Sequence, residues 1–114
     1  MRKGNVESWT VFYANARGLT SKRLSLIEVM GELNPQIALF TETMLKSGSK
    51  FEIDGYTFCG RNRDKKSSVG VGILVNNEIR EVVTPHETQR DIEIVWVSVR
   101  RRCLKPAFIG VYYG

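Results

Sequence analysis

The chain has few cysteines and no long apolar run, and both shortages exclude classes of protein. Its 114 residues include two cysteines, Cys59 and Cys103, without C-x-x-C spacing. This pattern excludes a disulfide framework and a cysteine-rich zinc site, so we expect reduced, partly buried thiols. No apolar run approaches the ~20 residues of a membrane span, and residues 1–8 lack the apolar core of a signal peptide. We therefore expect a nuclear or cytoplasmic protein that is not secreted and not in the membrane.

The chain also has few acidic residues. It contains 17 Lys and Arg residues but only 12 Asp and Glu residues, which gives a net charge of +5. Such an excess favours polyanionic partners, DNA first among them, although a solvated basic surface accounts for it equally well. The segment R-N-R-D-K-K is a candidate loop for the DNA backbone, with a solvated turn as the alternative. Its candidate DNA-binding residues are Arg61, Arg63, Lys65 and Lys66.

The first forty residues follow the pattern strand, helix, strand. Residues 9–13 are rich in β-branched and aromatic types, as in a buried strand. Thr20 or Ser21 can cap a helix that ends at Asn34, because the following proline disfavours the helical conformation there. A second apolar strand covers residues 37–40. This order predicts two neighbouring parallel strands joined by a crossover helix.

Behind this unit the sequence predicts a sheet-rich region and an α+β fold. We expect residues 84–90 to form a polar loop that exposes His86, and Gly70 and Gly72 to let sheet backbones approach closely. The last strand has no following partner in the sequence, which predicts an exposed edge through which two copies could pair as a homodimer. The expected strands are Tyr56–Cys59, Val69–Val75, Ile79–Val83, Ile92–Val99 and Ala107–Tyr113.

One polar residue follows each of the first two apolar runs. Asn15 comes after the first run and Glu42 after the second. Carboxylate and amide oxygens delivered from adjacent strand ends suit a hard cation such as Mg²⁺, with Mn²⁺ as the alternative. Taken singly, Asn15 could cap the turn before the helix and Glu42 could be a solvated carboxylate.

The order of these motifs resembles a known family. Along the chain come W-T-V-F-Y-A-N-A-R-G-L, N-P-Q-I-A-L-F-T-E-T, G-Y, R-N-R-D, V-G-V, W-V-S-V and V-Y-Y-G. The chain is similar to the N-terminal half of the endonuclease/exonuclease/phosphatase family, above all to the endonuclease domain of non-LTR (LINE-type) retrotransposon polyproteins. The resemblance implies that residues 9–114 are half of a four-layered α/β/β/α sandwich, behind a frayed segment 1–8.

The same resemblance implies roles for three residues. Glu42 matches the family's principal Mg²⁺ ligand, Asn15 its metal- and phosphate-orienting asparagine, and Tyr113 the tyrosine that supports the attacked phosphate, with Tyr112 the less favoured choice. The family's D-x-N and C-terminal Asp-His motifs are absent. We therefore expect a metal-dependent DNA-nicking domain that is inactive alone and is followed, in the family, by a reverse transcriptase. The alternative is a non-catalytic remnant that binds nucleic acid or protein.

Overall fold

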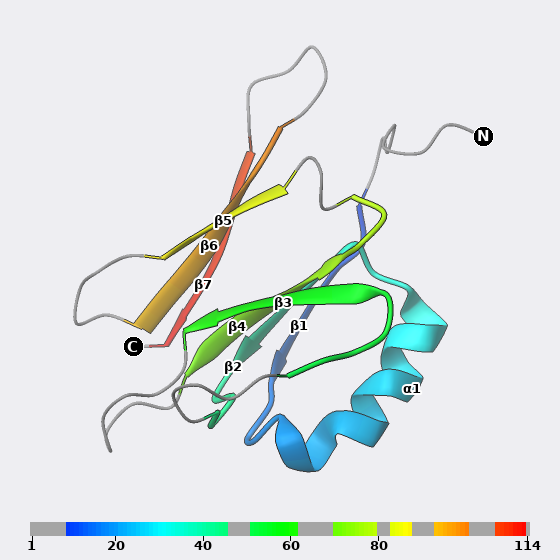
Figure 1. Ribbon diagram of the computed structural model, residues 1–114. Helices are drawn as coiled ribbons and strands as arrows, with labels where there is room; N and C mark the ends of the chain where they lie inside the picture. Colours follow the sequence, from blue (N-terminus) through cyan, green and yellow to red (C-terminus); the bar gives the residue numbers. More distant parts are fainter. Residues whose placement is uncertain are drawn as a thin grey trace.

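The computed structural model describes residues 9–45, 51–61, 70–79, 83–87, 93–100 and 107–113, and within them it has the α+β architecture that the sequence predicts. The first sheet has the strand order β1-β2-β4-β3, and the second sheet has the order β5-β6-β7 (Figure 1). No helix in the described ranges has the length and apolarity needed to cross a membrane. The elements are β1 (Val11–Asn15), η1 (Thr20–Lys22), α1 (Arg23–Leu33), β2 (Ile37–Thr41), β3 (Tyr56–Arg61), β4 (Val71–Asn76), β5 (Val83–Glu87), β6 (Glu93–Val99) and β7 (Ala107–Tyr113).

The predicted crossover unit is present, because β1 and β2 pair in parallel and α1 joins them. The strand extends to Asn15, two residues further than the sequence suggests. Neither Thr20 nor Ser21 caps α1: both lie in η1, and the helix N-cap is Lys22, without a side-chain hydrogen bond. At the other end Asn34 has a left-handed backbone (φ 45°), and its N–H donates to the Met30 carbonyl oxygen at 2.8 Å. This is a common way to close a helix before proline.

The first sheet is the middle layer of the molecule. In Figure 1, α1 lies against one of its faces and the second sheet lies on the other side. All residues of β2 and β4 are therefore buried, which is the continuous apolar pattern of strands covered on both faces. The helix side contains Ala16, Leu19, Leu26, Met30, Ala38, Phe40, Leu45, Phe51, Ile53 and Leu74. The side between the sheets contains Ile37, Leu39, Val71, Ile73, Val75, Ile79, Val83, Val95, Val97, Val99 and Val111.

The second sheet corrects two expectations. Residues 84–87 belong to strand β5 where a polar loop was expected, and Ile79 lies in a turn where the start of a strand was expected. His86 is not a solvated loop residue, because its ring stacks on Trp96 with centroids 4.1 Å apart and its Nε2 is 3.1 Å from the Ser98 Oγ. An edge strand tolerates proline and polar residues, so its sequence lacks the usual apolar alternation.

Two glycines on neighbouring strands make room for one aromatic ring. A Cβ atom at Gly60 on β3 or at Gly72 on β4 would lie within 2.4 Å of ring atoms of Phe58. The two residues are register partners, so the ring lies across both of them. We expected Gly72 to permit close backbone packing, and the structure shows that it accommodates a side chain. The ring of Phe58 also meets Phe51 edge-on, with centroids 5.8 Å apart.

Candidate metal site

Asn15 and Glu42 meet at the carboxyl ends of β1 and β2. Asn15 is the last residue of β1, and Glu42 directly follows β2, whose Thr41 is the register partner of Asn15. The Asn15 Nδ2 donates a hydrogen bond to the Glu42 Oε2 at 2.9 Å. The amide nitrogen of Asn15 is thus directed to the carboxylate of Glu42.

Backbone hydrogen bonds hold the two loops that follow these strands. The Ala16 N–H donates to the Thr41 carbonyl oxygen at 2.8 Å, and the Gly18 N–H donates to that of Glu42, also at 2.8 Å. The Leu19 N–H donates to the Thr43 carbonyl oxygen at 2.9 Å, and the Leu19 side chain is fully buried. The parallel pairing thus continues past both strands and fixes the position of Glu42 relative to Asn15.

Left-handed backbone conformations cluster at this site. Arg17 (φ 50°), Glu42 (φ 54°) and Met44 (φ 58°) are non-glycine residues with positive φ. The left-handed conformation costs roughly 1–2 kcal/mol for an ordinary L-residue. Such strain persists where surrounding contacts impose it, and it is concentrated at functional sites. Glu42, the carboxylate residue itself, has this left-handed conformation. The fold therefore holds Glu42 in place at a cost in conformational energy.

The donor set fits a hard cation that keeps part of its water shell. Glu42 is half-buried and uses Oε2 for Asn15, which leaves Glu42 Oε1 and Asn15 Oδ1 as oxygen donors. Mg²⁺ is commonly bound by one or two carboxylates together with waters and substrate phosphates. Across the described ranges no three His, Cys, Asp or Glu residues gather into a cluster, so a zinc-type site is not formed there.

Two cationic residues near Asn15 were not recognised from the sequence. The Lys22 Nζ donates to the Ala16 carbonyl oxygen at 3.1 Å, and Arg17 is exposed two residues after Asn15. A pocket of about 180 Å³ is lined by Asn15, Lys22 and residues of α1. Lys22 comes close only because η1 folds back beside the strand end, and no spacing rule in the sequence predicts that contact.

For the other predicted site residues the structure describes the backbone position of some and no part of the rest. Tyr113 is the last residue of β7, and in Figure 1 the C-terminus lies toward the same end of the sandwich as the carboxyl ends of β1 and β2. Arg61 ends β3 rather than beginning a loop, and Cys59 on the same strand is half-buried. The side chains of Tyr112, Tyr113 and Arg61 lie outside the described part of the structure, as do residues Arg63, Lys65, Lys66 and Cys103.

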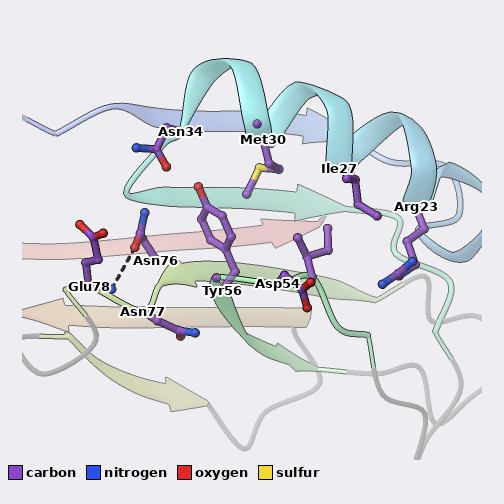
Figure 2. Close-up of a pocket in the computed structure, with 12 residues that line it drawn as sticks. Arg23, Ile27, Met30, Asn34, Asp54, Tyr56, Asn76, Asn77 and Glu78 are labelled. Atoms are coloured by element: carbon purple, nitrogen blue, oxygen red, sulfur yellow. Dashed lines mark hydrogen bonds between the residues drawn. The ribbon is translucent and has the colours of Figure 1, made fainter.

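A larger pocket, of about 420 Å³, runs along α1 from Arg23 to Asn34, with Tyr56 and Asn76 beneath the C-terminal end of the helix (Figure 2). Several of its polar groups have hydrogen-bond partners in the protein. The Tyr56 hydroxyl donates to the Pro35 carbonyl oxygen at 2.8 Å, and the Asn76 Oδ1 accepts the Glu78 N–H at 2.9 Å. Burial raises the pKa of Tyr56 above 10.0, and a side-chain hydrogen bond from Asn76 partly opposes that shift. These paired groups stabilise the junction between α1 and the sheet.

Comparison with known proteins adds a structural similarity to the sequence evidence. The crystal structure of the AP endonuclease LMAP from Leishmania major superposes with a TM-score of 0.75 over 92% of this chain, at 15% sequence identity. The shared fold is DNase I-like. This chain spans 40% of the length of that endonuclease chain. No family model matches the sequence, and no curated protein matches it. The motif order therefore predicted the fold, and its retroelement assignment stays a prediction.

Proposed function

We propose that this chain carries the metal-binding part of a DNA-nicking phosphodiesterase site of the retroelement endonuclease type. The observation that carries the proposal is the Asn15–Glu42 pair, held at 2.9 Å at the ends of two parallel strands. A fold shared with an AP endonuclease supports it. The proposed cofactor is Mg²⁺ or Mn²⁺, the proposed substrate is DNA, and a reverse transcriptase domain in the same polyprotein is the proposed partner.

In this proposal each residue has a defined task. Glu42 holds the cation, and the Asn15 amide orients the carboxylate through its hydrogen bond. The cation, when bound, neutralises phosphate charge and stabilises the leaving oxygen. Arg17 and Lys22 attract the DNA backbone toward the strand ends, and the basic residues between Arg61 and Lys66 extend this attraction. Tyr113, at the end of β7, supports the attacked phosphate.

Within the part of the chain that the structure describes, this proposal assigns no general base. The sole histidine of the sequence, His86, stacks on Trp96 in the second sheet and bonds to Ser98. It is therefore engaged away from the Asn15–Glu42 pair. General acid–base help is typically worth 10²–10⁴-fold in rate, so we expect residues 1–114 alone to bind the cation and DNA without efficient nicking.

The second candidate function is DNA binding without metal chemistry. The net charge of +5 supports it. The two candidates differ in one respect: binding through charge alone falls steeply with salt and does not respond to Glu42.

The deciding experiment measures metal binding and nicking in parallel. Titration of Mn²⁺ followed by water proton relaxation is performed on the wild type, Glu42→Ala and Asn15→Ala, with the exposed helix residue Glu32→Ala as the matched control. We expect binding to weaken at least about tenfold in the first two variants only. Equal Mn²⁺ binding in all four proteins would reject the metal site. Efficient nicking of supercoiled plasmid that Glu42→Ala abolishes would show instead that the chain already holds a complete site.

A further inference from the structure

A buried hydroxyl beside the candidate metal site lacks a partner. Thr43 directly follows Glu42 and is 1% exposed, and its Oγ1 has no hydrogen-bond partner among the residues that the structure describes. Thr41, on the other side of Glu42, is also buried, but its Oγ1 lies 3.1 Å from the Tyr13 hydroxyl oxygen. A hydroxyl that loses its hydration without gaining a protein partner destabilises the conformation that buries it. The Thr43 hydroxyl therefore disfavours the conformation of its own segment.

The backbone on both sides of Thr43 is strained as well. Glu42 and Met44 both have left-handed conformations, with φ of 54° and 58°. Backbone hydrogen bonds hold the segment in this state: the Thr43 N–H donates to the Gly70 carbonyl oxygen at 3.2 Å, and the Thr43 carbonyl oxygen accepts the Leu19 N–H at 2.9 Å. Water can replace the partners in such bonds at a small net cost. Residues 42–44 thus combine two strained residues with one unpaired hydroxyl, and opening of the segment relieves all three.

The flanks of this segment are anchored, which confines an opening to a few residues. Thr41 pairs with Asn15 of β1 on one side and with Val71 of β4 on the other. Leu45 is 4% exposed and packs in the core on the helix side. Met44 between them is 43% exposed, so burial of its side chain contributes little to hold the backbone in place. Segments of low local stability open without unfolding the rest of a protein.

We propose that residues 42–44 exchange between the described conformation and an open one, and that a bound cation selects the first. In the open conformation the Thr43 hydroxyl reaches water and the Glu42 carboxylate leaves the Asn15 amide. This inference rests on the proposed function, because the cation favours the conformation in which Glu42 and Asn15 present their oxygen atoms together. The affinity measured for the cation is then the intrinsic affinity multiplied by the fraction of the competent conformation. Thr43 is a positioning residue that sets this fraction.

Thr43→Val tests the inference, because valine keeps the shape of threonine and has no hydroxyl. Removal of the unpaired hydroxyl favours the described conformation, so the variant should bind Mn²⁺ more tightly by about threefold or more. The matched control is Thr41→Val, which deletes a buried hydroxyl that has a partner and should not tighten binding. Titration of Mn²⁺ followed by water proton relaxation measures both variants beside the wild type, each as the full chain.

Relaxation dispersion of the backbone amide nitrogens measures the opening itself on the μs–ms timescale. We expect exchange at residues 42–44 of the cation-free wild type, and we expect both Mg²⁺ and Thr43→Val to suppress it. Absence of this exchange in the wild type would overturn the inference. Equal or weaker Mn²⁺ binding by Thr43→Val would also overturn it, as would binding that Thr41→Val tightens equally.

The proposed function and this inference fail in different ways. Glu42→Ala that binds Mn²⁺ as tightly as the wild type would reject the cation site, whatever the exchange measurement gives. Binding that depends on Glu42 without exchange at residues 42–44 would keep the cation site and reject the opening. The wild-type measurement needs no variant, so the inference stays testable if Thr43→Val does not fold.

Discussion

Polar residues at the two ends of the first sheet differ in their hydrogen bonding. At the end under the C-terminus of α1, Tyr56 and Asn76 bond to nearby backbone groups. At the other end, Glu42 and Asn15 bond to each other, retain spare oxygen donors and sit among three left-handed residues. Polar groups that are paired with the backbone contribute to the fold, whereas polar groups with unused oxygen atoms are those that a ligand can engage. On this comparison, the Asn15–Glu42 end is the one at which we expect a ligand.

The largest effect that tests the difference between the two ends is expected when a second carboxylate is placed beside Glu42. Asn15→Asp removes the Nδ2 donor and sets a negative charge beside Glu42, so we expect a loss of about 1–2 kcal/mol in the free energy of unfolding. Because two carboxylates bind a divalent cation better than one, added Mg²⁺ should restore the loss. Thermal melts with and without Mg²⁺ measure both effects.

Asn77→Asp is the matched control at the opposite end. The Asn77 Oδ1 accepts the Thr57 hydroxyl at 2.6 Å, and aspartate keeps that acceptor. Its melting temperature should therefore not respond to Mg²⁺. An equal response in both variants would contradict the distinction between the two ends.

A smaller effect is expected where the polar groups are already satisfied. Tyr56→Phe leaves the Pro35 carbonyl oxygen without its hydroxyl donor and should cost about 1 kcal/mol. In the wild type the folded-state pKa of Tyr56 lies above its ordinary 10.0, chiefly because burial disfavours the phenolate. This contribution to stability is present below pH 10 and is lost as the pH rises through the folded-state pKa.

Denaturant melts between about pH 8 and pH 11 test this prediction. The wild type should lose stability at the alkaline end, and Tyr56→Phe should lose less. The exposed Tyr13→Phe provides the control, and a pH dependence that disappears in this variant instead would assign the effect to the wrong tyrosine.

The smallest expected effect concerns the strained backbone of Glu42. Glu42→Gly relieves the positive φ, worth roughly 1–2 kcal/mol, but it adds the backbone entropy of glycine, roughly 0.5–1 kcal/mol. Glu42→Ala loses the same hydrogen bond to Asn15 but keeps the strain, so Glu42→Gly should exceed Glu42→Ala in the free energy of unfolding by about 0.5–1 kcal/mol, measured by urea denaturation. Equal stability of the two variants would mean that the left-handed backbone carries no cost.

The sequence predicted the parallel β1–α1–β2 unit because its signals are local. The apolar runs, the crossover segment and the Asn34–Pro35 stop each lie within a few residues, and two parallel strands then place Asn15 and Glu42 together. The strand β5 was missed because its T-P-H-E composition is determined by its edge position and by stacking on Trp96. Lys22 was missed because its contact with Ala16 depends on the path of η1. Both the strand β5 and the Lys22 contact depend on long-range packing, which local patterns in a single sequence do not reveal.

Because of the ring of Phe58, we expect substitutions at positions 58, 60 and 72 to depend on one another. Any side chain at Gly60 or Gly72 would meet that ring, so a change at either glycine requires the ring of Phe58 to move. If Phe58 is replaced by a small residue, both glycines become free to vary, and larger side chains there would fill the vacated space. Related chains should therefore carry either an aromatic residue with two glycines or a small residue with larger neighbours, and mixed combinations should be rare.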